Sequence, residues 1–223
     1  MRLTVFGATG RTGRPIVEQA LAAGHEVVAF ARDPAKLSIA HERLTAVQGD
    51  ATDPSAVERA VEGADAVISV MATSGSQRIA RTGPLTRGTQ NILAAMEKYG
   101  VRRLVISSGA PAASDPQDVP DLRFTLLAAA VRLLAPASLA DTTGSVRATK
   151  ASDLDWTVVR MPSPTDAPPT GRVEAGFASR AMGMRIARAD AAAFMLREVV
   201  ECRYLRQTPV ICSRSSASRP ASG

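Results

Sequence analysis

The chain has 223 residues, of which 45% are hydrophobic and 22% are charged, as expected for one soluble globular domain with a full core. Its formal net charge is +6 at pH 7, which invites a nucleic-acid interpretation. Most arginines are scattered singly, and five Phe, one Trp and two Tyr are too few for stacking platforms. A nucleic-acid partner is therefore not expected, and positive charge directed at a phosphorylated cofactor explains part of the excess.

The first dozen residues predict a phosphate-binding turn. The apolar run Leu3–Phe6 is typical of a strand buried on both faces, and Gly7, Gly10 and Gly13 follow it. These glycines permit a sharp turn, a close approach to a pyrophosphate, and tight packing of a helix that begins near Pro15. The start of a helix attracts anions. A glycine-rich turn without a ligand is the alternative, because the spacing is not the G-x-G-x-x-G of many dinucleotide enzymes.

The end of the second strand predicts the type of cofactor. Strand Glu26–Ala31 is followed by Arg32 and Asp33, where a βαβ fold places the groups that contact the adenosine ribose. An NAD enzyme carries a carboxylate there, whereas Arg32, with Lys36 one helical turn later, suits a ribose 2′-phosphate. Asp33 is expected to cap a short helix that starts at Pro34. NADP(H) is therefore predicted in preference to NAD(H).

The third and fourth strands also end in residues expected at a cofactor. Strand Leu44–Gln48 leads to Asp50, placed to accept a hydrogen bond from the adenine amine, and to Asp53, expected as the N-cap of a helix over 54–62. The fourth strand, residues 65–71, leads into a small polar loop at the carboxyl edge of the sheet. The residues expected there beside the ribose and the nicotinamide are Met71, Ala72 and Thr73.

The fifth strand and the segment after it are expected on the substrate side. A helix over residues 84–98 precedes strand 103–107, whose carboxyl end carries Ser107 and Ser108. A serine in that position either orients a carbonyl or only forms a turn. Residues 110–120 form a loop at the same edge, where specificity is expected. Residues 122–134 predict a helix that is apolar on most of its surface, and a core helix is favoured over a lid or an oligomer face.

The remaining elements are expected to close the sheet and cover its edge. A more polar helix over 137–152 precedes strand Asp155–Met161, and a proline-rich loop follows over residues 161–172. Contact with a small substrate is favoured for this loop, with simple chain return as the alternative.

The last part of the chain is expected to end in a helix, a strand and a tail. Short strands near 173–177 and 184–187 precede a helix that has Asp190 in its first turn and runs to about Cys202, and strand Thr208–Cys212 follows. Residues 213–223 contain only Ser, Arg, Ala, Pro, Gly and no large apolar side chain, so they are expected to be disordered. Residues 1–212 are therefore expected to form a single domain.

Several classes of protein and site are not expected. Cys202 and Cys212 are too few for a disulfide framework, and His25 and His41 have no second histidine at ligand spacing, so no metal is predicted. The chain lacks an apolar span of 18 residues and enters its first strand without room for a signal peptide. A cytoplasmic protein without a membrane partner is expected.

Five stretches together match one family pattern: Gly7–Gly13, Gly49–Asp50, Gly88–Ile92, Leu104–Ser108 and Leu154–Pro162. On these residues the chain resembles the atypical short-chain dehydrogenases with NmrA-like NAD(P)H-binding domains. Within that group it is most similar to the flavin reductase and biliverdin reductase B branch, from Arg2 to about Cys212. The run Asp190–Leu196 adds to this similarity.

The resemblance implies an α/β fold, a doubly wound Rossmann-type parallel sheet of order 3-2-1-4-5-6 with a small C-terminal substrate cap. It implies a pyrophosphate site formed by Gly7, Thr9, Gly10, Arg11, Thr12 and Gly13. Arg32 would bind the 2′-phosphate, and Asp50 and Ala51 the adenine. The residues implied around the nicotinamide are Met71, Ala72, Ser107, Ser108, Met161 and Pro162.

Two departures from the branch fall on the substrate side. Where the branch carries histidines, this chain has Thr142 and Pro164, and it also has an insertion around residues 122–137. The resemblance therefore implies the cofactor more directly than the acceptor.

Two functions follow from these expectations. The first is an NADPH-dependent oxidoreductase, a monomer or homodimer, that transfers a hydride to a small carbonyl, quinone or flavin-like acceptor. The alternative is a non-catalytic NADP(H)-sensing regulator of the NmrA type, which binds a protein partner. The reductase is favoured because such a regulator usually carries extra length for its partner.

The source of the proton distinguishes this chain from typical short-chain dehydrogenases, which use a tyrosine with a lysine four residues later. Here Tyr99 and Tyr204 are followed at that spacing by Arg103 and Thr208. The remaining catalytic candidates are Ser108, a weak acid, and Lys150. The expected acceptor is therefore one whose reduced form takes its proton from water, such as a quinone, flavin or conjugated enone.

Overall fold

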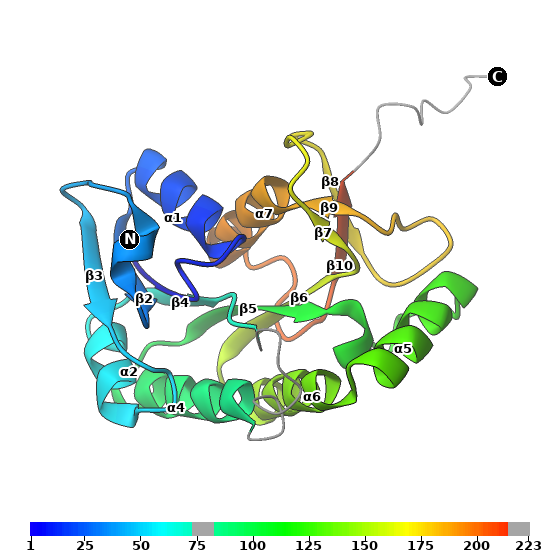
Figure 1. Cartoon of the computed structure of the whole chain (residues 1–223), viewed down its shortest axis with the longest axis horizontal. Helices are drawn as coiled ribbons and strands as arrows, with labels where there is room; N and C mark the ends of the chain where they lie inside the picture. Colours follow the sequence, from blue (N-terminus) through cyan, green and yellow to red (C-terminus); the bar gives the residue numbers. More distant parts are fainter. Residues whose placement is uncertain (73–82, 214–223) are drawn as a thin grey trace.

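The computed structural model describes residues 1–72 and 83–213. Its main sheet consists of β1 (Arg2–Phe6), β2 (Glu26–Ala31), β3 (Leu44–Gln48), β4 (Ala66–Ser69), β5 (Arg103–Gly109), β6 (Asp155–Met161), β8 (Val173–Gly176) and β10 (Val210–Ser213). The eight strands lie in the order β3-β2-β1-β4-β5-β6-β10-β8, and only β8 runs antiparallel to its neighbour (Figure 1). This confirms the predicted order 3-2-1-4-5-6 and adds β10 and β8 beyond it.

Helices cover both faces of the sheet. The helices of the two layers are α1 (Gly13–Ala22) with α7 (Arg188–Glu201) on one face, and α2 (Pro54–Val61), α4 (Pro84–Lys98) and α6 (Pro136–Ala151) on the other (Figure 1). Along β1, Leu3 and Val5 point into the first layer while Phe6 points into the second. Strands covered on both faces are mostly apolar, which is why β2 shows no polar alternation; on β1 the buried Thr4 donates to Ala60 O at 2.6 Å.

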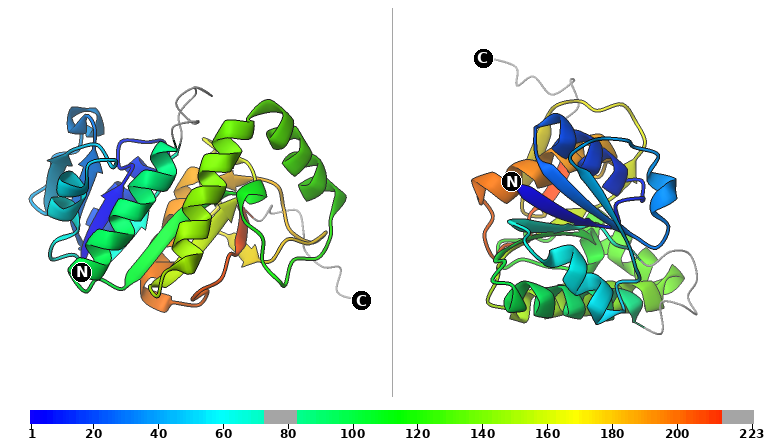
Figure 2. Two further views of the ribbon diagram at one scale, coloured as in Figure 1. Left: turned by 90° about the horizontal axis from the view of Figure 1, so that it is seen from below. Right: turned by 90° about the vertical axis from the view of Figure 1, so that its left-hand side faces the viewer.

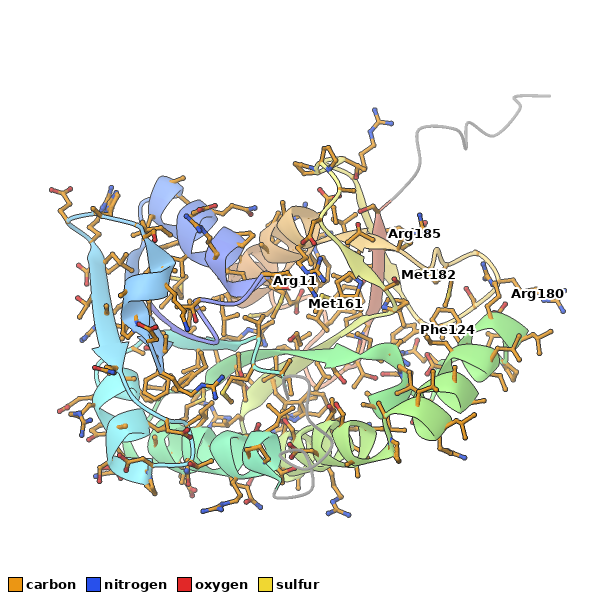
Figure 3. The ribbon with its side chains drawn as sticks, in the orientation of Figure 1. Arg11, Phe124, Met161, Arg180, Met182 and Arg185 are labelled. Atoms are coloured by element: carbon orange, nitrogen blue, oxygen red, sulfur yellow. The ribbon has the colours of Figure 1, made fainter. Side chains whose placement is uncertain are left out.

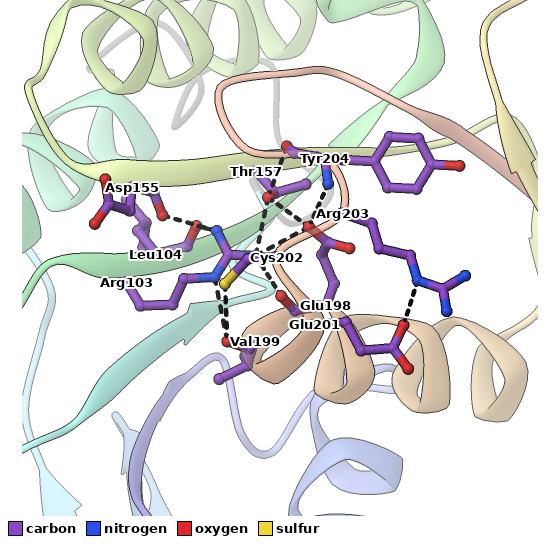
Figure 4. A network of polar contacts seen from close by, with 10 residues as sticks. All are labelled: Arg103, Leu104, Asp155, Thr157, Glu198, Val199, Glu201, Cys202, Arg203 and Tyr204. Atoms are coloured by element: carbon purple, nitrogen blue, oxygen red, sulfur yellow. Dashed lines mark hydrogen bonds and ion pairs between the residues drawn. The ribbon is translucent and has the colours of Figure 1, made fainter.

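A buried ion pair fixes α7 to the amino half of the sheet (Figure 4). Arg103 Nη2 on β5 lies 3.1 Å from Glu198 Oε1 on α7 and donates to Thr157 Oγ1 on β6 at 3.0 Å. The exposed fractions of the Arg103 and Glu198 side chains are 9% and 2%. Removal of either partner would leave an uncompensated buried charge, so the pair fixes the position of α7 and hence of its first residue, Arg188.

Helix α5 (Leu122–Leu134) does not belong to the core, and the expectation of a core helix is wrong. None of its residues, all of which are described, is buried, and Leu133 is 81% exposed. Figure 2 shows α5 at one end of the molecule, beyond α6, from which it bends by 115°. An apolar helix sequence predicts that the helix surface is covered, but it does not specify what covers it.

The end of the chain covers the carboxyl edge of the sheet. β7 (Pro164–Thr165) and β9 (Ile186–Ala187) form a separate two-stranded sheet, and β8 and β9 correspond to the two short strands expected there. The predicted tail begins one residue too early, because Ser213 belongs to β10 and donates through its hydroxyl to Asp190 at 2.8 Å. Residues 214–223 of the predicted tail lie outside the described residues.

Candidate functional site

A cavity of about 1100 Å³ opens at the carboxyl edge of the parallel strands. It is lined by the glycine turn, by the ends of β2 to β6, by the first turns of α4, α6 and α7, and by the inner side of α5. The predicted site residues that line it are Gly7, Thr9, Gly10, Arg11, Thr12, Arg32, Asp50, Ala51, Met71, Ala72, Ser107, Ser108, Met161 and Pro162. Ligands of parallel α/β sheets bind at this edge.

Three predicted residues are not among the lining residues, and Thr73 lies outside the described residues. Gly13 lies behind the glycine turn. Lys36 has a 73% exposed side chain, and its ammonium pairs with Asp33 Oδ2 at 3.3 Å. Asp33 occupies the expected N-cap position but makes no side-chain cap hydrogen bond to any described residue. The expectation that Lys36 reaches the cofactor is therefore not supported by its position.

Lys150 is also not among the described lining residues, so its position does not support its assignment as a catalytic candidate. The cavity contacts the first half of α6 through Thr142, and Lys150 follows eight residues later, about 12 Å along the helix axis. Its ammonium donates to Ser114 O at 3.2 Å. Both lysines were proposed from their place in the sequence, which does not specify the direction of a helical side chain.

The glycine turn forms a close-fitting cradle at the start of α1. Gly7 has φ +79°, and a Cβ added to Gly13 would lie 2.0 Å from Gly7 O. Gly10 N donates to Gly7 O at 3.0 Å, which closes the turn. Thr12, the N-cap residue, makes no side-chain cap hydrogen bond to any described residue. The helix start is thus open to the cavity, and backbone N–H groups there suit a pyrophosphate.

Positive charge dominates the polar lining. Arg11, Arg32, Arg87 and Arg188 all line the cavity, and Asp50 is the one acid among the described lining residues. Hydrogen bonds from Thr52 lower the pKa of Asp50, and the charges of Arg32 and Arg87 lower it further. Asp50 therefore stays a hydrogen-bond acceptor inside a basic cavity.

Sequence reasoning missed Arg87 and Arg188. Each lies in the first turn of a helix, α4 or α7, that begins at the carboxyl edge of the sheet. Helix starts at that edge were the available signal, since every βαβ unit places them beside the ligand site.

An exposed carboxylate links the glycine turn to the C-terminal cap. Asp166 Oδ2 lies 3.3 Å from Arg11 Nη1, and Asp166 Oδ1 lies 2.6 Å from Arg188 Nη1. The side chains of Arg11 and Asp166 are 73% and 63% exposed, whereas that of Arg188 is 11% exposed. An exposed pair such as Arg11–Asp166 contributes little energy, so an anionic ligand can replace Asp166 on Arg11.

The serines predicted on β5 lie where β5 meets β6. Ser108 is 4% exposed, and its Oγ donates to Gly109 O at 3.1 Å. The β5–β6 register places Gly109 opposite Met161, so the end of β5 and Met161 border the same part of the cavity (Figure 3).

The other end of the cavity is mostly apolar. The apolar side chains there are Pro111, Ala112, Leu127, Val131, Leu139, Met161, Pro162 and Pro164. Thr142 and Pro164, which stand where the similar branch has histidines, both line the cavity. The Thr142 hydroxyl donates to Ser138 O at 2.8 Å, one turn earlier in the same helix.

Two carboxylates, the buried Asp190 and the half-buried Asp118, hold the loops around this end. Asp190 accepts from Thr170 N at 3.0 Å, Gly171 N at 3.0 Å and Ser213 Oγ at 2.8 Å. Burial alone would raise the pKa of Asp190, but these hydrogen bonds outweigh burial and lower it. Asp118 similarly binds both terminal nitrogens of the buried Arg160 side chain, at 2.7 and 2.6 Å. The sequence predicted Asp190 only as an acid in a helix's first turn.

Comparison with known proteins agrees with this geometry. A family model described as NAD(P)H-binding matches residues 7–201. A short-chain dehydrogenase/reductase from Veillonella parvula, solved in complex with NADP, superposes with a TM-score of 0.76 at 16% identity, over 99% of both chains. ChuY, an anaerobilin reductase from Escherichia coli O157:H7, gives a TM-score of 0.75 at 21% identity, over 99% of this chain and 100% of ChuY. The chain therefore belongs to the NAD(P)H-binding family, which confirms the family resemblance drawn from the sequence.

Curated relatives match over about half of this chain. The photosystem II assembly factor Ycf39 of Synechocystis is 33% identical over 118 residues, which are 52% of this chain and 36% of Ycf39. The 3-diazoavenalumate denitrifying reductase of a Streptomyces species is 37% identical over 131 residues, 55% of this chain and 42% of that enzyme. The chain thus covers less than half the length of these relatives.

Proposed function

Because this chain belongs to the NAD(P)H-binding family, we propose that it is an NADPH-dependent reductase that transfers a hydride to a small carbonyl, quinone or flavin-like acceptor. The observation that carries the proposal is the division of one cavity into two ends. One end combines an open helix start with arginines, and the other is mostly apolar. A dinucleotide fits the first end and a planar or apolar acceptor the second.

The basic end fits the phosphates and adenosine of NADPH. The backbone of Gly10 to Thr12 would hold the pyrophosphate, since the helix start behind it is uncapped. Arg32 and Arg87 would hold the 2′-phosphate, and Asp50 would accept from the adenine amine. NADPH, when bound, supplies the hydride.

The apolar end would exclude water and orient the acceptor beside Ser108 and Met161. Neither Tyr99 nor Tyr204 is among the described lining residues, and the Tyr204 hydroxyl donates instead to Ala175 O at 3.1 Å. With Lys150 also distant, the acceptor gains one hydride and then one proton taken from water. Ser108 Oγ would contribute a hydrogen bond, and the protein would act mainly by positioning.

The alternative is a protein that senses NADP(H) without chemistry. The same lack of a described acid at the acceptor end supports it, as does the similarity to Ycf39, a photosystem II assembly factor. The smooth apolar lining around Leu127 and Val131 supports the reductase, because a sensor has no need of an acceptor pocket.

The deciding experiment follows the consumption of NADPH by the purified protein with a panel of quinones, flavins, conjugated enones and simple ketones. The reductase should reduce the conjugated acceptors and turn simple ketones over poorly. Ser108→Ala should lower kcat by about tenfold or less, and Lys150→Ala should leave it unchanged. Tight NADPH binding with no turnover of any acceptor would favour the sensor. Efficient reduction of an unactivated ketone that is lost in Lys150→Ala would instead indicate that Lys150 supplies the proton.

A further inference from the structure

Helix α5 presents apolar side chains on two opposite sides. On its inner side, Leu127 and Val131 line the cavity, and Phe124 packs against the small cluster that contains Met182 (Figure 3). On its outer side, the residues at intervals of four, three and four form what we term the leucine stripe: Leu122, Leu126, Ala129 and Leu133. Leu122, Leu126 and Leu133 are 71%, 60% and 81% exposed.

The charges around the leucine stripe are mostly basic. Arg132 on α5 is exposed, as is Arg180, whose backbone oxygen accepts a hydrogen bond from Arg123 near the start of α5 (Figure 3). The nearby acids are engaged, because Asp121 pairs with Arg123 and Asp118 pairs with Arg160. The region thus combines projecting leucines with a net positive charge, and the whole chain carries +6.

We propose that α5 docks on an anionic lipid bilayer, with the leucine stripe in the headgroup region and the surrounding arginines on lipid phosphates. Exposed apolar residues next to basic ones are the composition of helices that lie in a membrane interface. This proposal departs from the expectation, drawn from the sequence, that the protein has no membrane partner.

A second copy of the chain fits this surface less well. A helix of 13 residues is about 20 Å long and about 10 Å wide, so its outer face covers roughly 200 Å². A stable protein interface buries about 800 Å² on each partner. Pairing two copies through α5 would also bring their arginines together, whereas anionic lipid neutralises them.

The geometry favours a helix that lies on the bilayer. Within the described residues, no single helix is long and apolar enough to cross a membrane, and α5 and α6 pass that test only as a pair bent by 115°. Docking through the outer side of α5 leaves its inner side in the wall of the cavity. The apolar end of the cavity would then lie next to the lipid surface.

Vesicle flotation of the full chain tests the proposal. The protein should float with vesicles of equal parts phosphatidylcholine and phosphatidylglycerol, at least about tenfold less with phosphatidylcholine alone, and less as salt is raised. The double variant Leu126→Ser, Leu133→Ser should lower binding to the anionic vesicles by about tenfold or more. Val200→Ser is the matched control, since Val200 on α7 is 63% exposed but lies outside the leucine stripe. Circular dichroism melts of each variant check folding.

Two results would overturn the proposal. If the Leu126→Ser, Leu133→Ser double variant binds as well as the Val200→Ser control, and salt weakens the binding of both, the protein is adsorbed by its positive charge and the leucines have no role. Absence of binding, together with a dimer in light scattering that the double variant alone dissociates, would assign α5 to contact with a second copy.

Discussion

Arg32 and Arg87 approach the same carboxylate, Asp50, from the end of β2 and the first turn of α4. Two guanidinium groups beside the expected ribose position favour a cofactor that carries a 2′-phosphate. Arg32→Ala and Arg87→Ala should each weaken NADPH binding by roughly 1.5–3 kcal/mol, the scale of a hydrogen bond to a charged group, and leave NADH binding nearly unchanged. Fluorescence titration with both cofactors measures this difference.

Lys36→Ala is the matched control for these arginines, because Lys36 is close in sequence but is not among the lining residues. It should change neither affinity. Equal affinities of the unmodified protein for NADPH and NADH would contradict the assignment of Arg32 and Arg87.

Gly13 shows how little space the phosphate cradle leaves. A Cβ at Gly13 would lie 2.0 Å from the backbone oxygen of Gly7, so Gly13→Ala must displace either the turn or α1. We expect a loss of about 1–3 kcal/mol in the free energy of unfolding and loss of NADPH binding. Gly176→Ala is the control, because its Cβ would lie 3.8 Å from the nearest described atom, Met182 Sδ. Urea unfolding compares the two, and equal effects would be inconsistent with a cradle at Gly13.

At the scale of single residues, the sequence predicts positions that the backbone fixes better than it predicts where a long side chain points. The glycine turn and the strand ends line the cavity because the βαβ connection fixes where they lie. Lys36 and Lys150 are not among the described lining residues, since a few degrees of helix rotation or one nearby acceptor redirects a long flexible side chain. Arg87 and Arg188 were missed, although the sequence shows both as charged residues at the start of a helix.

At the scale of elements, Asp190 joins α7 to the 162–172 loop and to β10 through Thr170, Gly171 and Ser213. Its pKa is lowered in the folded protein, so an unfolded Asp190, with a pKa near 3.9, binds protons more readily. The stabilisation is therefore complete above about pH 4 to 5 and is lost as the pH falls through the folded pKa. Asp190→Asn should destabilise the protein at pH 7 by about 1–3 kcal/mol and flatten the decline of stability below about pH 4.

Asp166→Asn is the control for Asp190→Asn, because Asp166 belongs to the same loop but its side chain is 63% exposed. Urea unfolding measures the free energy of unfolding of both variants between about pH 3 and pH 7, the range in which an Asp carboxyl titrates. Parallel pH profiles for the wild type and Asp190→Asn would refute a structural role of the Asp190 carboxylate.

The elements themselves were largely predictable, and α5 shows the limit. Helix bounds at 122–134 were correct, because Asp121 caps the start by accepting from Arg123 N and Pro136 follows the end. What α5 contacts was not predictable, because that depends on where the 115° bend directs the helix. Arg160 was missed as well, since an arginine inside an apolar strand gives no sign in the sequence that it is buried against Asp118.

At the scale of the whole molecule, the net charge of +6 and the cavity arginines act together on an anionic cofactor. Salt screens such charges over a distance of about 8 Å at 0.15 M ionic strength. The affinity for NADPH should therefore fall more steeply with salt than the affinity for NADH, because the 2′-phosphate adds charge beside Arg32. Titrations at several salt concentrations give the two slopes, and identical slopes would contradict a basic 2′-phosphate site.

The two ends of the cavity come from different parts of the chain. The basic end takes its glycine turn and three of its four arginines from residues 7–87, whereas the apolar end is built from residues 111–164. Because a chain emerges from the ribosome with its N-terminus first, the nucleotide half leaves the tunnel well before the acceptor half exists. We expect the nascent chain to have a cofactor in reach before it has a pocket for a substrate, so that the acceptor end is completed around an already formed nucleotide half.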